Sequence, residues 1–393
     1  MDFSSEFSDC IELPPTLHVG CPNVGDRDLF HRLVDEIFSS RRLTNDGPVV
    51  AELESKLCEY LGVRHCVTVC NATLGLQLAC RALDLTGEVI VPSFTFVASA
   101  HALQWEGVTP VFADVDPIRH TIDPDHVARL VTSRTTGILG VHLWGSPCNP
   151  TELAQLASDH GLRLFFDAAH AFGCGNHGKM VGQSGECEVF SFHATKFFNT
   201  FEGGAIATND DALAAKIRRM RSFGFAGVDH VVGIGTNAKM NEVCGAMGLS
   251  MFADLESILQ CNRRHYLNYR DGLAGIDGVR LFSLDHLEHC NWQYIVVEID
   301  ESEFGCSRDD VMRSLHDVGV LARRYFYPGC HRMEPYRTLY RERIDRLPVT
   351  ERLCDSVLCL PTGSALRESD VDRVCAAIRS LADAKRSVIR RAV

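Results

Sequence analysis

The chain has 393 residues, of which 46% are hydrophobic and 23% charged, and this length allows one large and one small domain. Its formal net charge of −12 argues against a general nucleic-acid-binding protein, because such proteins are usually basic. The 17 cysteines form no C-x-x-C pair, so we expect no zinc ribbon or other metal centre and interpret them as reduced thiols of a cytoplasmic protein.

The N-terminal residues are acidic and polar, without the apolar core of a signal peptide. No apolar run approaches the length of a membrane span, so we expect no contact with a membrane. We interpret residues 1–15 as a flexible tail. Two helices are predicted next, at residues 28–38 and 49–61, because apolar residues recur there at helical spacing on either side of a turn cluster.

A short strand is predicted at residues 64–70, followed by the polar turn Asn71-Ala72-Thr73 and then by a helix. The free N–H groups of that helix and its dipole point at the turn, so this segment can bind an anion such as a phosphate. Simple capping of the helix by Thr73 would explain the same residues equally well.

Predicted strands and helices alternate through the middle of the chain, which indicates a largely parallel sheet with right-handed crossovers. A helix is expected at residues 151–160. The strands are expected at residues 88–91, 108–116, 137–143 and 162–167.

Two residues at the ends of predicted strands point to the chemistry. Asp167 and Lys196 each follow a buried apolar run. Burial lowers the pKa of a lysine and frees the neutral amine that Schiff-base chemistry needs. Each residue alone has a simpler explanation, because the aspartate could cap a helix and the lysine stem could lie along apolar surface. Together, at the strand ends where ligands collect, they suggest pyridoxal phosphate (PLP), with Asp167 against the pyridinium nitrogen and Lys196 bound to the cofactor.

The segments D-A-A-H-A, F-S-F-H-A-T-K and E-G-G together resemble the sugar aminotransferases of the DegT/DnrJ/EryC1/StrS family, which use PLP. The resemblance implies the aspartate-aminotransferase-like fold (PLP fold type I): an α/β large domain with a mostly parallel central sheet, and a smaller C-terminal α+β domain. We place the large domain at residues 16–256 and the small domain at residues 257–393. In the small domain we expect extended segments at residues 292–299 and 321–327.

The resemblance also implies contacts to the cofactor. Ala72 and Thr73 match the phosphate-binding turn, where the family usually has Ser-Gly-Thr, and Ser191 matches a serine that contacts the same phosphate. Phe96 is expected to stack on the pyridine ring, with Phe94 as the competing choice.

Three further positions carry over from the family. His170 stands where the family usually has Gln, near the phenolic oxygen of PLP. Asn237 matches an asparagine that reaches the PLP phosphate of the neighbouring subunit, which implies a homodimer with shared active sites. Lys196 itself favours transamination, because related dehydratases carry His at that position.

The substrates also come from resemblance, since H-L-W-G and Y-x-Y-P-G-C-H-x-x-E-P-Y-R are similar to segments of dTDP-4-keto-6-deoxyglucose 4-aminotransferases. The implied reaction transfers the amino group of L-glutamate to the 4-keto sugar by a ping-pong mechanism via pyridoxamine phosphate. Tyr325 is a candidate for substrate binding, and the candidates for binding the nucleotide diphosphate are Arg323, Arg324, His331, Arg332 and Arg337. For any single one of these basic residues, a solvated surface charge is the simpler explanation.

Two alternatives stay open on these residues. A 3-keto nucleotide sugar is the alternative substrate, and a PLP-binding regulatory protein without turnover is an alternative class of protein. A Rossmann oxidoreductase, in contrast, lacks support, because no G-x-G-x-x-G opens a helix after the first strand.

Overall fold

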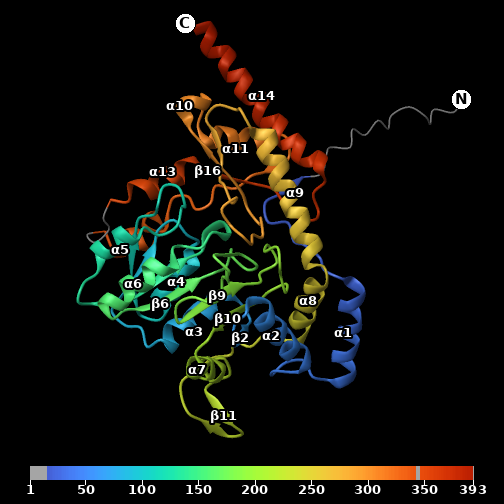
Figure 1. Ribbon diagram of the computed structural model, residues 1–393, viewed down its shortest axis with the longest axis vertical. Coiled ribbons are helices and arrows are strands. Elements are labelled where there is room, and N and C mark those ends of the chain that lie inside the picture. Colours follow the sequence, from blue (N-terminus) through green and yellow to red (C-terminus); the bar gives the residue numbers. More distant parts are fainter. Residues whose placement is uncertain (1–15, 342–345, 393) are drawn as a thin grey trace, which may run out of the picture.

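The computed structural model describes residues 16–341 and 346–392 (Figure 1). The tail predicted for residues 1–15 lies outside the described residues. A seven-stranded sheet with helices on both faces forms the lower part of the molecule in Figure 1, and a three-stranded sheet with its helices forms the upper part. Within the described ranges, no helix is long and apolar enough to cross a membrane.

The large sheet confirms the expected, mostly parallel α/β architecture. Its strands run in the order β2-β10-β9-β6-β5-β3-β4. The neighbours from β9 to β4 pair in parallel, whereas β10 is antiparallel to both β2 and β9. The strands are β2 His65–Val69, β3 Glu88–Pro92, β4 Thr109–Ala113, β5 Thr135–Val141, β6 Arg163–Asp167, β9 Cys187–Ser191 and β10 Gly204–Thr208.

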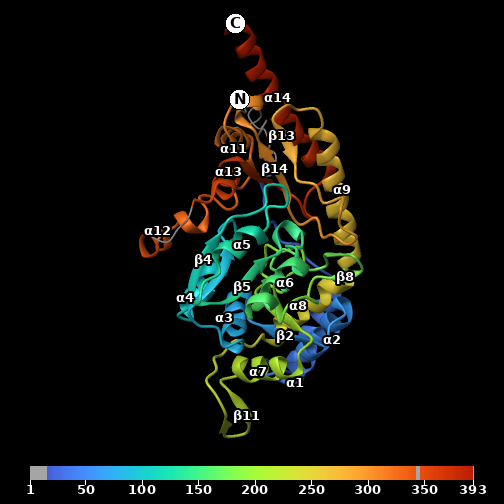
Figure 2. The same cartoon turned by 60° about the vertical axis from the view of Figure 1, so that its left-hand side comes forward.

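Helices cover both faces of this sheet, because successive residues of each buried strand point to opposite sides. On one face, α3, α4 and α7 pack over a core that includes Val189, and on the other, α1, α2 and α8 pack over a core that includes Phe190. Figure 2 shows the strands between these two layers. The helices are α1 Arg27–Ser40, α2 Pro48–Leu61, α3 Ala72–Ala82, α4 Val97–Trp105, α5 Pro124–Leu130, α6 Pro150–His160, α7 Asp211–Arg221 and α8 Glu242–Ala253, with the 3-10 turn η1 Leu143–Gly145.

The sequence does not predict strand β10. Its residues G-A-I-A-T include a glycine and two alanines, which have low strand propensity. The strand forms because it pairs on both sides, with β2 and with β9.

The C-terminal part contains the antiparallel sheet β13-β14-β16, and α9 and α14 pack against each other beside it. β1 (Leu17–His18) pairs in parallel with β15 (Val320–Leu321), so the first described residues lie beside this part of the chain. A division of the chain at residue 257 remains a proposal, and α9 spans that position. The elements are β13 Val279–Leu281, β14 Ile295–Ile299, β16 Val357–Leu360, α9 Leu255–Leu273, α10 Glu301–Phe304, α11 Arg308–Asp317, α12 Tyr336–Leu339, α13 Pro348–Ser356, α14 Glu368–Ala392 and the 3-10 turn η2 Cys330–Arg332.

Both extended segments expected in the C-terminal part are shorter than the sequence predicts. The strand expected at residues 292–299 begins only at Ile295. The stretch at 321–327 is a strand only in β15, and then follows an irregular path that buries Phe326 against Trp144. Two short hairpins complete the fold, β7 (Gly175–Asn176) with β8 (Lys179–Met180) and β11 (Phe225–Gly227) with β12 (His230–Val231), and the second projects from the lower end of the molecule in Figure 1.

Candidate active site

A cavity of about 340 Å³ lies at the carboxyl ends of the parallel strands of the large sheet. β6 ends there at Asp167 and β9 at Ser191, and the turn after β2 and the segment after β3 form further parts of the wall. Ligands of open α/β sheets bind at this edge. The predicted site residues that line the cavity are Ala72, Thr73, Phe96, Asp167, His170, Ser191, Lys196 and Tyr325.

Asp167 is a buried carboxylate with a fixed orientation. Its Oδ2 accepts a hydrogen bond from Ser99 Oγ at 2.7 Å, and its Oδ1 accepts one from the Ala169 backbone N–H at 3.0 Å. Thr95 Oγ1 lies 3.0 Å from Ser99 Oγ and so holds the serine in turn. Burial raises the pKa of Asp167, while the bonds from Ser99 and Ala169 lower it. A buried carboxylate of this kind is suited to a cationic partner in the cavity.

Lys196 provides the amine of the site. Its Nζ donates to the Tyr294 hydroxyl at 3.1 Å. Burial lowers the pKa of Lys196 from 10.5 to about 8, against the attraction of the Asp167 carboxylate. A substantial fraction of the amine is therefore neutral near physiological pH, which is the state that reacts with carbonyl groups.

The predicted anion site is the first turn of α3. Asn71 caps this helix, because its side chain accepts from the Leu74 backbone N–H at 2.9 Å. The capping role considered for Thr73 therefore belongs to Asn71. Ala72 and Thr73 are helical residues of the first turn, so Ala72 fits here without the left-handed φ that would require glycine. Their N–H groups have no acceptor within the helix, which is the usual property of a first turn.

Gly204 lets strand β10 start directly beside this turn. A Cβ at Gly204 would lie 3.0 Å from the Ala72 backbone nitrogen and 2.6 Å from the Phe190 carbonyl oxygen. Only glycine allows this close approach of two backbones, which brings the α3 turn and Ser191 to the same end of the cavity. The second glycine of E-G-G thus has a packing role in the site.

The two candidate aromatic residues after β3 lie in different places. Phe94 is buried and packs edge-on against Trp144 and Phe326, at ring distances of 6.2 and 5.8 Å. Phe96 lines the cavity and has a side chain that is 57% exposed. Phe96 is therefore the one that a planar ligand could contact.

His170 is buried in an aromatic stack at the back of the cavity. Its ring lies 5.6 Å from the Trp144 ring at an interplanar angle of 29°, and its Nε2 lies 3.1 Å from the Tyr294 hydroxyl. Burial, and then the nearby Lys196, lower the pKa of His170 well below its ordinary value. The imidazole is therefore neutral.

Four of the basic residues predicted to bind the substrate do not line the cavity, namely Arg324, His331, Arg332 and Arg337. Arg324 pairs with Asp309 at 2.7 Å and covers the Tyr327 ring, and it is absent from the cavity wall. His331 is buried and its Nδ1 lies 2.6 Å from Ser93 Oγ, so it supports the chain behind the site. Arg323, the fifth basic candidate, lines the cavity.

Sequence reasoning missed Ser99 and Tyr294 as site residues, and it named Arg323 only as one of five basic candidates. Ser99 has a usable signal, because it lies in the first turn of a helix that follows a strand end. Tyr294 has none, since it approaches Lys196 from 98 residues away in the chain. Arg323 differs from Arg324 only in the direction that an irregular backbone gives its side chain.

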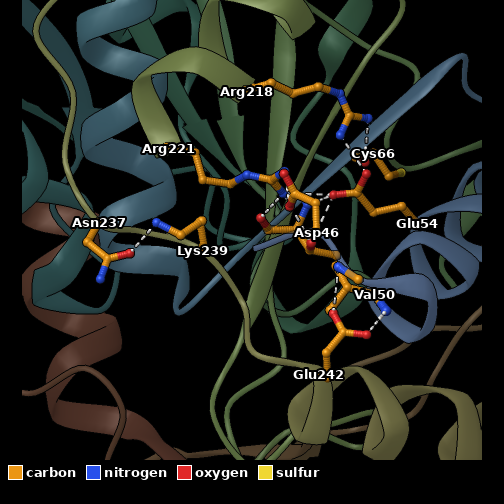
Figure 3. A network of polar contacts seen from close by, with 11 residues as sticks. Asp46, Val50, Glu54, Cys66, Arg218, Arg221, Asn237, Lys239 and Glu242 are labelled. Carbon is orange, nitrogen blue, oxygen red and sulfur yellow. Dashed lines mark hydrogen bonds and ion pairs between the residues drawn. The ribbon is translucent and has the colours of Figure 1, made fainter. Parts of the chain in front are cut away.

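Asn237 lies outside the cavity wall of its own chain, and its exposed Oδ1 accepts from Lys239 Nζ at 2.8 Å (Figure 3). The segment around it is anchored by the buried Arg221, which pairs with Glu54 at 2.8 Å and Asp46 at 2.6 Å. The Ala238 backbone N–H donates to the Arg221 carbonyl at 3.0 Å, so the network fixes the position of this segment.

Comparison with known proteins identifies the class. The chain belongs to the DegT/DnrJ/EryC1/StrS aminotransferase family, whose model matches residues 26–379. This confirms the expected family and an aminotransferase activity.

Individual relatives cover nearly the whole chain. It is 36% identical over 362 residues to a dTDP-4-amino-4,6-dideoxy-D-glucose transaminase of Escherichia coli, covering 91% of this chain and 97% of the relative. It is 31% identical over 380 residues to a UDP-4-amino-4-deoxy-L-arabinose–oxoglutarate aminotransferase of Shewanella sediminis, covering 92% and 96%. The crystal structure of DesI in the presence of its TDP-sugar product superposes with a TM-score of 0.91 at 48% identity, covering 96% of both chains.

Proposed function

We propose that the protein is a PLP-dependent aminotransferase that transfers the amino group of L-glutamate to C4 of dTDP-4-keto-6-deoxyglucose, giving dTDP-4-amino-4,6-dideoxyglucose. The observation that carries this proposal is one cavity that contains the amine of Lys196, the buried carboxylate of Asp167 and the first turn of α3. The E. coli relative and DesI favour a dTDP-linked sugar, and the names of both curated relatives place the amino group at position 4.

The residues present fit the cofactor. The N–H groups of Ala72 and Thr73, with the Ser191 hydroxyl, would hold the phosphate at the helix N-terminus. Phe96 would cover the ring, and Asp167 would pair with the pyridinium nitrogen. Lys196 would hold the cofactor covalently between turnovers. When bound, the cofactor supplies an electron sink for the negative charge that develops at the substrate α carbon.

The protein supplies proton transfer and orientation. Lys196 Nζ would remove the proton from the α carbon of glutamate in the first half-reaction and would donate a proton to C4 of the sugar in the second, which suits an amine with a pKa of about 8. Asp167 remains ionised in its bonds to Ser99 and Ala169 and so keeps the ring nitrogen protonated. Tyr325 and Phe326 form one side of the cavity.

Arg323 is the proposed contact for an anionic part of the substrate. It is an exposed cation on the cavity wall, its guanidinium lies 5.6 Å from the Tyr325 ring centre, and it forms no ion pair with the residues that the structure describes. The diphosphate of the sugar nucleotide and the carboxylates of glutamate share the chemistry that such a guanidinium recognises.

We further propose a cytoplasmic homodimer in which Asn237 completes the site of the partner. The support is that Asn237 is exposed, lies off its own cavity and is held in place by the Arg221 network. The cysteines of the described residues are free thiols, as suits a reducing compartment.

The test is an absorbance titration of the purified protein with PLP. We expect a visible band of lysine-bound PLP that is absent in Lys196→Ala, is lost with L-glutamate and returns with dTDP-4-keto-6-deoxyglucose. NMR of the product then distinguishes amination at C4 from amination at C3. A band that does not change when glutamate is added would favour the alternative of a regulatory PLP-binding protein. The absence of any band would overturn the cofactor assignment.

A further inference from the structure

Residues 291–294, which directly precede β14, bind to both loops that carry the reactive groups. Asn291 Nδ2 donates to the backbone carbonyls of His170 at 2.9 Å and Phe172 at 3.0 Å. Gln293 Oε1 accepts from the Phe197 backbone N–H at 3.1 Å. These contacts explain why the expected strand starts late, and they fix the backbone from which Tyr294 reaches the site.

Tyr294 stands between the two nitrogen-containing side chains of the cavity. Its hydroxyl lies 3.1 Å from Lys196 Nζ on one side and 3.1 Å from His170 Nε2 on the other. The tyrosine ring is buried, and the His170 ring lies 4.3 Å from it. Lys196, Tyr294 and His170 are therefore connected by two successive hydrogen bonds, which we call the Lys196–Tyr294–His170 relay.

The Lys196–Tyr294–His170 relay can form its hydrogen bonds in both protonation states of Lys196. An ammonium group only donates, so the Tyr294 oxygen accepts from it and the hydroxyl proton goes to a bare His170 Nε2. A neutral amine can accept, so His170 in its other tautomer donates to Tyr294, and Tyr294 donates to the amine. A phenylalanine at position 294 could serve neither state.

The other groups that face Lys196 are less suited than Tyr294 to form a hydrogen bond with it in both protonation states. Asp167 at the end of β6 is the carboxylate that attracts Lys196, and it already accepts from Ser99 and Ala169. Tyr325, on the segment after β15, stays protonated because burial raises its pKa. Burial likewise raises the pKa of Tyr294, so it remains a hydroxyl, while burial keeps His170 neutral.

We infer that Tyr294, relayed to His170, is a positioning residue that stabilises the Lys196 amine in both of the protonation states through which it acts. The inference rests on the proposed role of Lys196 as the acid and base of transamination. Because hydrogen bonds to charged groups are about twice as strong as neutral ones, loss of the hydroxyl weakens the ammonium form more than the amine. Tyr294→Phe should therefore lower the Lys196 pKa by about one pH unit.

The experiment measures the Lys196 pKa directly. Full-length protein saturated with pyridoxamine phosphate leaves the Lys196 amine free, and its labelling by a trace of acetic anhydride is quantified by peptide mass spectrometry as a function of pH. Tyr269→Phe is the matched control, because it removes another buried tyrosine hydroxyl, one that donates to the Pro361 carbonyl at 3.0 Å.

We expect wild type and Tyr269→Phe to titrate together and Tyr294→Phe to titrate about one pH unit lower. An unchanged Lys196 pKa in folded Tyr294→Phe overturns the inference. If that variant does not fold, His170→Phe replaces it, with the same direction expected, and an unchanged pKa in His170→Phe overturns the inference in the same way. Labelling does not depend on turnover, so failure of the glutamate reaction in wild type would count against the proposed function alone.

Discussion

Ser99→Ala should move the acidic limb of the pH–rate profile to higher pH. Ser99 Oγ donates to Asp167 Oδ2 at 2.7 Å, and both side chains are buried. A hydrogen bond to a charged group contributes about 1.5–3 kcal/mol, and about 1.4 kcal/mol corresponds to one pH unit in a pKa. Because the bond stabilises the carboxylate, its loss should raise the Asp167 pKa by about one to two pH units. Asp167 then becomes protonated at a higher pH, and once protonated it no longer stabilises the protonated ring nitrogen of PLP.

The assay is the single-turnover rate of the glutamate half-reaction, followed by absorbance across the acidic and neutral range. Ser250→Ala is the control, because it removes a buried serine hydroxyl that donates to the Met247 carbonyl at 3.1 Å in α8, away from the cavity. Its profile should match that of wild type. An acidic limb that stays in place in Ser99→Ala, with PLP still bound, would refute the reasoning that Asp167 must be ionised and that Ser99 keeps it so.

Three further variants test other parts of the structure. Arg323→Gln should raise the KM of either L-glutamate or the sugar nucleotide about tenfold, because about 1.4 kcal/mol of charge-assisted binding is lost. Arg324→Gln should change neither KM by much, because Arg324 pairs with Asp309. Equal effects of the two variants would contradict the placement of these side chains. Gly204→Ala should weaken PLP binding at least about tenfold, because its Cβ would lie 2.6 Å from a backbone oxygen, while Gly227→Ala, with open space around it, should bind PLP normally in the same titration. Glu54→Gln should lower the free energy of unfolding by about 3 kcal/mol at neutral pH, because it removes the more buried of the two carboxylates that pair with Arg221 and leaves only the exposed Asp46. Burial raises the Glu54 pKa, but its arginine partners bring it below the ordinary value. Urea titrations should therefore show the stability difference between wild type and Glu54→Gln shrinking as the pH falls below the ordinary pKa of a glutamate and through the lowered pKa of Glu54. A stability difference that does not change with pH would disprove the pairing.

The positions of the proposed reactive residues at the sheet edge could be predicted from the sequence because the signals are local. Asp167 ends one short apolar run and Lys196 lies a few residues after another, and such a run predicts a buried strand whatever lies around it. The turn before α3 is equally local, since a strand, a small polar turn and an amphipathic helix imply a helix N-terminus that faces the strand ends. These three features were sufficient to predict the sheet edge on which the cavity lies.

Other features depend on contacts between distant parts of the chain. Strand β10 has weak intrinsic preference and exists because β2 and β9 pair with it. Arg323 and Arg324 are adjacent and chemically identical, yet one lines the cavity and the other pairs with Asp309. Their difference arises where the chain leaves β15 and packs Phe326 against Trp144.

Local sequence was thus enough to place the proposed reactive groups at one edge of the sheet, because hydrophobic periodicity and turn residues act over a few neighbouring positions. The surroundings of those groups emerge only from tertiary packing: Ser99 on Asp167, Tyr294 on Lys196, and a glycine where two backbones meet. A pKa or a close approach depends on burial and on partners within a few ångströms, and those partners are brought together by packing between segments far apart in the chain.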